Sequence, residues 1–328
     1  MNKTLKNIIQ FIVFITIGIF IFWLVYRNIN IKDIVVEIKK FNFLIISISL
    51  IFGILSHYVR AIRWKLIVEP LGYKPRTINS FFAVLIGYLA NFAVPRMGEV
   101  TRCGVLSKYE KIPFSNAIGT VVVERILDLL MSLFIFFIAL LLQFGEIKEF
   151  FIKHKILDNL SFNIYNIKFI VFVLIVILST IILFSLRDRI KQNRIIQKIY
   201  NFIKGIIDGI KSIKNIERKW LFIFYTLLIW VLYILTFYVC FYAYEPTSNL
   251  SFLVVITVFS MANFGTIAPV QGGIGPWHFM VIQTLLIYSV SELNGQAFAF
   301  VVHTTQTVML IILGFISLAM VPLFNKVK

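Results

Sequence analysis

Long apolar runs constrain this chain more than any other feature of its sequence. Stretches such as Ile8 to Tyr26, Lys168 to Leu186 and Trp220 to Tyr244 each hold about 20 mostly apolar residues, the length that a helix needs to cross a hydrocarbon layer of ~30 Å. Of the 328 residues, 59% are apolar and 14% are charged, whereas soluble domains carry about 25% charged residues. The fold class predicted from these runs is an all-α, polytopic integral membrane protein.

Basic residues separate the apolar runs and predict the topology. The net charge of +17 comes from Lys and Arg between the runs rather than from one patch with stacking aromatics, so no nucleic-acid partner is expected. The segment 187–218 is strongly basic, which predicts a cytoplasmic connection. Its part from 190 to 213 has a helical apolar period, which favours an amphipathic helix on the cytoplasmic leaflet over a solvated basic linker. The connections 244–250 and 291–296 lack Lys and Arg and should face outward. Lysines near both chain ends place both termini in the cytoplasm.

This topology requires two of the apolar segments to enter the membrane and return. The segments lie at approximately 8 to 26, 41 to 59, 78 to 94, 117 to 142, 168 to 186, 219 to 243, 251 to 268, 275 to 290 and 297 to 321. Returns are expected at Pro95 to Gly98 and at Pro269 to Gly273, because Pro removes a backbone donor and Gly admits non-helical conformations. The expected architecture is about six full transmembrane helices plus two re-entrant hairpins, within one membrane domain spanning 1–328.

The two hairpins also read alike, which suggests an inverted repeat. Each contains Ala-Asn-Phe followed by Pro-x-x-Gly, with the asparagines at Asn91 and Asn263. The first repeat would be 41–142 and the second 219–321, each a span, a hairpin and a span. Paired interruptions of this kind point to a transport site, although chance recurrence in a Phe-rich chain is the alternative.

Ionisable residues in and near the first hairpin are the main candidates for a binding site. Glu124, Arg125 and Asp128 lie within an apolar run and can share one side of a helix, either facing a cavity or forming a self-neutralising cluster between helices. The hairpin itself supplies three further candidates, Arg96, Glu99 and Arg102. The arginines could bind an anionic head group, or they could simply extend to the membrane interface.

The second hairpin offers backbone donors and histidine instead of cations. Its candidate residues are Gln271, Gly272, Gly273, Gly275 and His278. A half-helix opening at Gly275 could bind an anion, and His278 and His303 could exchange protons or be structural. The Arg60, Arg63 and Trp64 group is interpreted as an interface anchor, with a role in drawing lipid phosphates to the site as the lesser alternative. No catalytic set, cofactor motif or metal-ligand spacing is found, so an enzyme is the less expected outcome.

Three motifs carry a resemblance to a known family. They are Asn91-Phe-Ala-Val-Pro-Arg-Met-Gly-Glu-Val-Thr-Arg102, Glu124-Arg125-x-x-Asp128 and Pro269-x-x-Gly-Gly-Ile-Gly275. In order and spacing they resemble the flippase-like integral membrane domain of the lysylphosphatidylglycerol synthase family along nearly the whole chain. The resemblance implies a prokaryotic inner-membrane protein linked to flipping of a modified phospholipid. The chain stops at Lys328, so the aminoacyl-transferase domain of full-length synthases is expected to be missing.

The resemblance has two departures, and it leaves three functions open. The family usually has an acidic residue where this chain has His278, and a basic residue near His303. The leading hypothesis is a translocator of a phospholipid or polyprenyl-phosphate lipid. A membrane enzyme that modifies a lipid head group and a transporter of a small soluble anion are the alternatives. The sequence indicates no oligomeric state.

Overall fold

A computed structural model of the protein describes residues 16, 18–27, 30–145, 216–268 and 270–325, and the regular structure in these ranges is helical. The helices follow in the order α2 (Ile31–Ile38), α3 (Phe43–Val68), η1 (Glu69–Leu71), α4 (Thr77–Ala93), α5 (Met97–Glu110), α6 (Phe114–Leu142), α10 (Lys219–Tyr242), α11 (Glu245–Ser248), α12 (Phe252–Gly265), η5 (Gln271–Gly273), α13 (Pro276–Ile287) and α14 (Glu292–Leu323). The predicted all-α class is confirmed for these residues.

The described part of the chain contains four helices that are long and apolar enough to cross a membrane, namely α3, α6, α10 and α14, and two shorter apolar helices, α4 and α12. Side-chain caps mark where some of the long helices begin. Asn42 Oδ1 accepts hydrogen bonds from the first-turn amides of α3, and the Ser291 hydroxyl accepts one at the start of α14.

The six-span count stays a prediction. The apolar segment 168–186 lies outside the described residues, as does most of the amphipathic connection predicted at 187–218. Of the first apolar segment, residues 16 and 18–26 are described, and they are helical.

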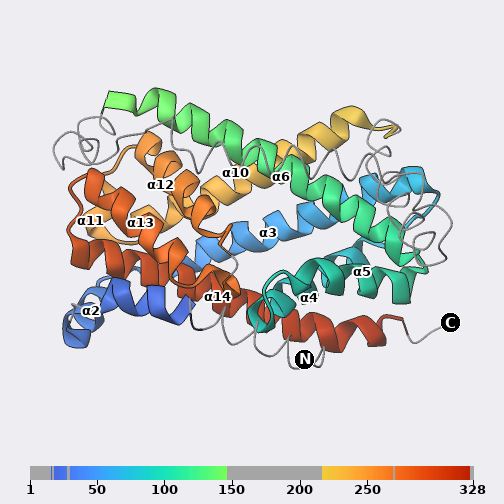
Figure 1. Ribbon diagram of the computed structural model, residues 1–328, viewed down its shortest axis with the longest axis horizontal. Helices are drawn as coiled ribbons and strands as arrows, with labels where there is room; N and C mark the ends of the chain where they lie inside the picture. Colours follow the sequence, from blue (N-terminus) through green and yellow to red (C-terminus); the bar gives the residue numbers. More distant parts are fainter. Residues whose placement is uncertain (1–15, 17, 28–29, 146–215, 269, 326–328) are drawn as a thin grey trace, which may run out of the picture.

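Two helical hairpins point toward each other from opposite ends of the molecule. In Figure 1 the α4–α5 hairpin enters from the right and the α12–α13 hairpin from the left. Their tips meet at Phe92 and Gly272, where a Cβ added to the glycine would lie 2.5 Å from Cε1 of the Phe92 ring. The interrupted segments 78–107 and 251–290 therefore fold as returning helix pairs, each broken where its Pro-x-x-Gly sequence predicted.

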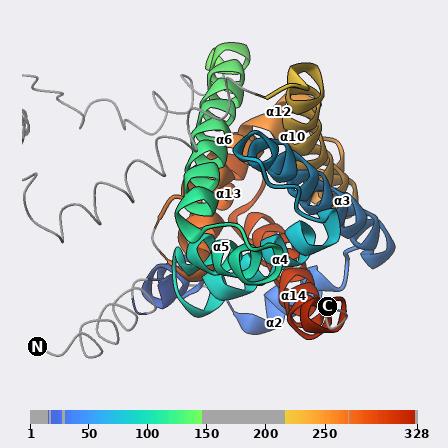
Figure 2. The ribbon, with the colours of Figure 1, turned by 90° about the vertical axis from the view of Figure 1, so that its right-hand side faces the viewer.

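Helix packing joins the two halves of the chain. α3 packs along α10, α4 packs against α14, and α12 packs against α6. Viewed along the long axis, α6 stands on one side and α3 with α10 on the other (Figure 2). One apolar core lies mostly among α10, α12, α13 and α14, and a second lies among α3, α4, α5 and α6.

The outer face of α6 is strongly apolar. Six large apolar residues on this helix are more than half exposed: Leu129, Leu130, Phe134, Phe137, Leu141 and Leu142. An exposed apolar surface of this extent is expected where a protein contacts lipid rather than water.

Candidate functional site

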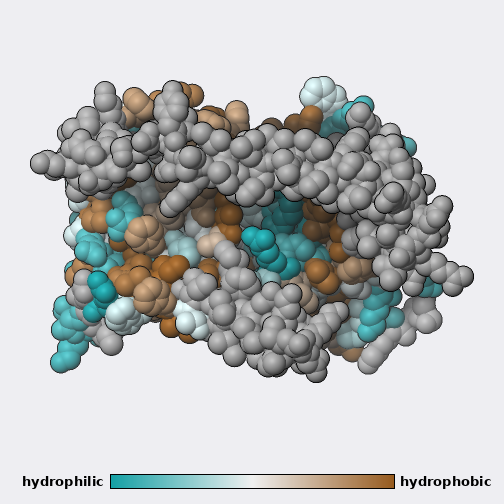
Figure 3. All heavy atoms as spheres, viewed as in Figure 1, coloured by the Kyte–Doolittle hydropathy of each residue, from teal (hydrophilic) through white to brown (hydrophobic). Residues whose placement is uncertain are grey.

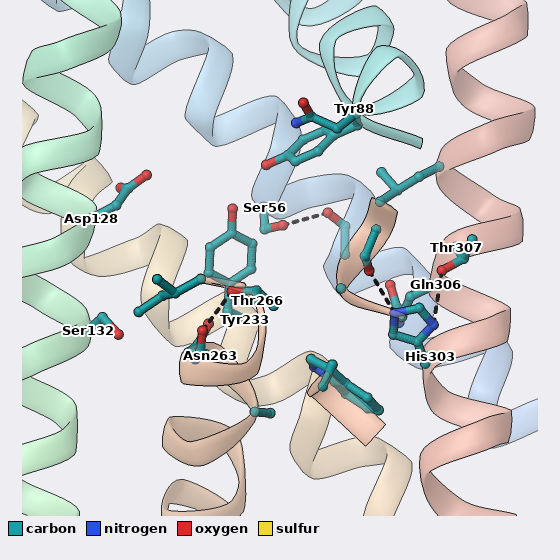
Figure 4. Close-up of a pocket in the computed structure, with 18 of the residues that line it drawn as sticks. Ser56, Tyr88, Asp128, Ser132, Tyr233, Asn263, Thr266, His303, Gln306 and Thr307 are labelled. Carbon is teal, nitrogen blue, oxygen red and sulfur yellow. Dashed lines mark hydrogen bonds between the residues drawn. The ribbon is translucent and has the colours of Figure 1, made fainter. Parts of the chain in front are cut away.

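A cavity of about 850 Å³ lies where the two hairpin tips meet. Residues from both hairpins and all four long helices line it. Figure 4 shows Asp128 and Ser132 projecting from α6 on one side and His303 and Thr307 from α14 on the other, with Tyr88 and Tyr233 between them. On the face seen in Figure 3, hydrophilic residues lie in a recess near the middle of the molecule, bordered by hydrophobic ones. The cavity is of the size that small-molecule and head-group sites usually have.

The tip of the first hairpin is held by local backbone chemistry. Asn91 Oδ1 accepts a hydrogen bond of 2.7 Å from the Gly98 amide, so this asparagine satisfies a donor in the first turn of α5. A Cβ on Gly98 would collide with the Gly87 carbonyl oxygen, so glycine lets α4 and α5 approach closely. Between them, Arg96 adopts a left-handed conformation with φ of 62°. Its side chain is exposed and lines the cavity.

A buried ion-pair network lies beside the cavity, and two of its members, Arg60 and Asp128, line it. Arg60 contacts Asp128 at 2.8 Å, and Arg63 contacts Asp128 at 2.9 Å and Glu124 at 3.2 Å. Glu124 Oε2 also lies 2.7 Å from Arg102 Nη2, an ion pair without the angles of a well-aligned hydrogen bond. The network ties α3, α5 and α6 together. The α6 carboxylates are neutralised by arginines of α3 and α5 and not, as the self-neutralising alternative expected, by Arg125 of the same helix.

The predicted interface anchor on α3 is wrong. Arg63 and Trp64 have no exposed surface, and Arg60 is 4% exposed. Trp64 Nε1 donates to Thr120 Oγ1 at 2.9 Å, and the Arg102 guanidinium lies 4.7 Å from the centre of the Trp64 ring. These side chains point toward α6, whose carboxylates neutralise the two arginines of α3. The prediction failed because the sequence does not show which face of α3 packs against α6.

The predicted cationic residues separate into cavity-lining and buried positions. Arg96 and Arg125 line the cavity, and Arg125 Nη2 lies 2.6 Å from Glu99 Oε1. Arg102 and Glu124 do not line it and are buried in the network. Extension of Arg102 to the membrane interface is therefore contradicted, because a side chain that extends there would be exposed.

The other predicted site residues also separate between the cavity wall and the positions behind it. Those that line the cavity are Asn91, Glu99, Asp128, Asn263, Gly272 and Gly273. Gln271, Gly275 and His278 do not line it. Gly275 packs against Gly18, where an added Cβ would lie 2.7 Å from the carbonyl oxygen. The start of α13 at Pro276 therefore faces the first apolar segment instead of the cavity. This contact does not support the expectation that the N-terminus of α13 binds an anion.

His278 and His303 lie side by side. Their ring centres are 4.5 Å apart, and His303 Nε2 lies 2.9 Å from the Gly272 carbonyl oxygen. His278 packs edge-on against Phe22 and Tyr26. His303 thus ties α14 to the second hairpin tip, much as Glu124 ties α6 to the first hairpin through Arg102.

Sequence reasoning missed several cavity residues, most of them aromatic or amide side chains within apolar runs. The missed residues are His57, Tyr88, Trp230, Tyr233 and Gln306. Gln306 could have been predicted from the sequence, because an amide side chain within a long apolar run needs a polar neighbour or a polar cavity. Tyr and Trp carry little signal of this kind, since membrane helices contain many of them.

Residues 8–314 match the family described as the lysylphosphatidylglycerol synthase TM region. The chain belongs to this family. It is also similar to a UPF0104 membrane protein of Methanocaldococcus jannaschii, with 28% identity over 262 residues that cover 76% of this chain and 75% of the relative. No solved structure matches the chain. The family and the long apolar helices make this a multi-pass membrane protein linked to lipid handling.

Proposed function

We propose that the protein translocates a phosphate-bearing lipid across the prokaryotic cytoplasmic membrane. The observation that carries this proposal is the cavity between the hairpin tips, which combines cationic side chains with an apolar lining at mid-length of the long helices. Arg96 has no ion-pair partner among the residues described, and Arg125 is half-exposed beside Glu99. Such guanidinium groups bind phosphate by charge-assisted hydrogen bonds.

The arrangement of the helices supports an inverted repeat with units at 41–142 and 219–321. α3 and α10 occupy equivalent places in the two units and pack on each other. The pairing of α4 with α14 has its counterpart in the pairing of α12 with α6, and the hairpins enter from opposite ends. Transporters with inverted repeats expose a site between their broken helices to each side in turn. The hairpins would be the re-entrant elements of that mechanism.

The membrane placement follows from charge and from the exposed apolar face. We place the basic connections and both termini in the cytoplasm, with six spans across the membrane. The exposed apolar side chains of α6 would face the acyl chains while the phosphate enters the cavity beside this helix.

A leaflet assay in proteoliposomes tests the proposal. Labelled phosphatidylglycerol or polyprenyl phosphate is incorporated, and its exchange between leaflets is followed with the wild type, Arg96→Ala, Arg125→Ala and Arg76→Gln. Arg76 is a matched control, because it is half-exposed and pairs with Glu110 away from the cavity. Exchange should fall by at least tenfold in the first two variants and persist in the third.

Unchanged exchange in both cavity variants would overturn the proposal. Mass spectrometry of the same liposomes separates the alternatives, because a lipid with an altered mass would indicate head-group modification instead. Uptake of a soluble anion without lipid exchange would indicate an anion transporter.

A further inference from the structure

Three side chains that line the cavity each have a buried nitrogen donor without a hydrogen-bond acceptor among the described residues. These donors are Arg60 Nη1, Trp230 Nε1 and Gln306 Nε2. The residues Arg60 and Trp230 are 4% and 5% exposed. Arg63 and Arg102 also have nitrogens that find no hydrogen-bond partner within the described ranges, but neither side chain lines the cavity. We call Arg60, Trp230 and Gln306 the donor wall; it comes from α3, α10 and α14.

The unpartnered atoms of the donor wall are all hydrogen-bond donors. A guanidinium, an indole N–H and an amide NH₂ can donate hydrogen bonds at these atoms but cannot accept them. Leaving a buried donor unpaired costs free energy, so a bound group with acceptor oxygens would satisfy several such atoms at once. An ammonium group, which only donates, would leave all three unsatisfied.

The charges around the cavity favour a net-anionic occupant. The cavity-lining ionic residues and the ion pairs behind them comprise five arginines and three carboxylates within the described ranges, an excess of two positive charges. In surroundings of low dielectric constant this excess favours an anion and disfavours a cationic head group.

Two further buried atoms on cavity-lining residues also lack a hydrogen-bond partner within the described ranges, Glu99 Oε2 and His57 Nδ1, and the imidazole nitrogen donates or accepts according to its tautomer. Glu99 lines the cavity, and its Oε2 is buried with no hydrogen-bond partner in the part of the chain that the structure describes, while Oε1 lies 2.6 Å from Arg125. Arg125 neutralises the charge of this carboxylate, so what remains is an acceptor rather than an uncompensated anion. A hydroxyl can donate to it without adding positive charge to the site.

We propose that the donor wall selects a net-anionic phosphate ester whose other polar groups are hydroxyls, and that it rejects head groups carrying an ammonium. This inference rests on the proposed function and names the substrate class of the same site. It places the phosphoryl and hydroxyl oxygens against Arg60, Trp230 and Gln306, with a hydroxyl directed to Glu99. Aminoacylated phosphatidylglycerol would then be a poor occupant.

Competition binding to the purified full chain in neutral detergent tests the selectivity. Fluorescent phosphatidylglycerol is displaced by phosphatidylglycerol, phosphatidylethanolamine, lysyl-phosphatidylglycerol or soluble glycerol phosphate. Phosphatidylglycerol should compete at least tenfold better than either amine-bearing lipid. Weak competition by glycerol phosphate would assign the site to a lipid, whereas equal competition would overturn the lipid assignment.

Two tryptophan variants separate binding from structural effects. Trp230→Phe removes an N–H that has no hydrogen-bond partner among the described residues and leaves a smaller ring in the apolar core. It should lower thermal stability modestly and weaken phosphatidylglycerol binding about tenfold. Trp64→Phe is the matched control, since its N–H already bonds Thr120 and its ring lies outside the cavity lining. It should lower stability and leave binding unchanged. Gln306→Met provides a second donor deletion if Trp230→Phe misfolds.

Equal affinity for the three lipids would overturn the proposal, as would unchanged binding in both donor deletions. Different results would reject the proposed translocation and the proposed selectivity of the donor wall. Lipid exchange without head-group preference would retain translocation and reject the donor wall. Head-group preference in binding, with no exchange in liposomes, would retain the donor wall and reject translocation.

Discussion

Replacing Glu124 with glutamine should destabilise the protein by about 3–5 kcal/mol, the usual cost of removing one partner from a buried ion pair. Glu124 and Arg63 have no exposed side-chain surface, and the Arg102 side chain is 5% exposed. After the substitution Arg63 still contacts Asp128 at 2.9 Å. Arg102 has no second carboxylate among the described residues, so most of the cost comes from its uncompensated charge.

The free energy of unfolding can be compared by denaturant titration in lipid bicelles, with tryptophan fluorescence as the signal. The double variant Glu124→Gln/Arg102→Gln removes one charge of each sign and should recover a large part of the lost stability. Arg76→Gln is the control, because Arg76 is half-exposed in a surface pair and should cost less than about 1 kcal/mol.

Two results would refute this reasoning. A loss below about 1 kcal/mol for Glu124→Gln would mean that the carboxylate does not compensate a buried charge. A double variant no more stable than the single one would mean that Arg102 is not the residue left unpaired.

Further predictions concern backbone conformation and pH. Arg96→Gly should raise the free energy of unfolding by about 1 kcal/mol, because glycine adopts the left-handed conformation at this position without steric strain. The same variant should reduce lipid exchange, because it removes a guanidinium from the cavity. Gly272→Ala should reduce stability in thermal melts, because the added Cβ meets Phe92, and Phe92→Ala should restore part of the loss. Burial raises the pKa of Glu37, but hydrogen bonds from Lys40 and Tyr244 outweigh it and leave the pKa below its ordinary value. The thermal midpoint should therefore be highest above about pH 5 and fall as pH drops through the lowered pKa, a dependence that Glu37→Gln should reduce.

The sequence alone determined the class of structure and where its helices break. Apolar runs of membrane length permit little except helices, since lipid cannot satisfy unpaired backbone groups. Pro95 and Gly98 interrupt the first hairpin for reasons that act within a few residues, and the second hairpin repeats the pattern. Local chemistry of this kind can be read without knowing what packs against it.

Tertiary structure decided which charges face the cavity. Arg102 belongs to a hairpin motif and was expected in the site, but α6 presents Glu124 to it and buries both. Arg60 was expected at the interface, but the packing of α3 beside α6 and α10 turns it toward Asp128 and the cavity. Whether an arginine binds a ligand or a carboxylate depends on how neighbouring helices are rotated about their axes. That rotation is set by contacts between residues far apart in the chain, so only the folded structure fixes it.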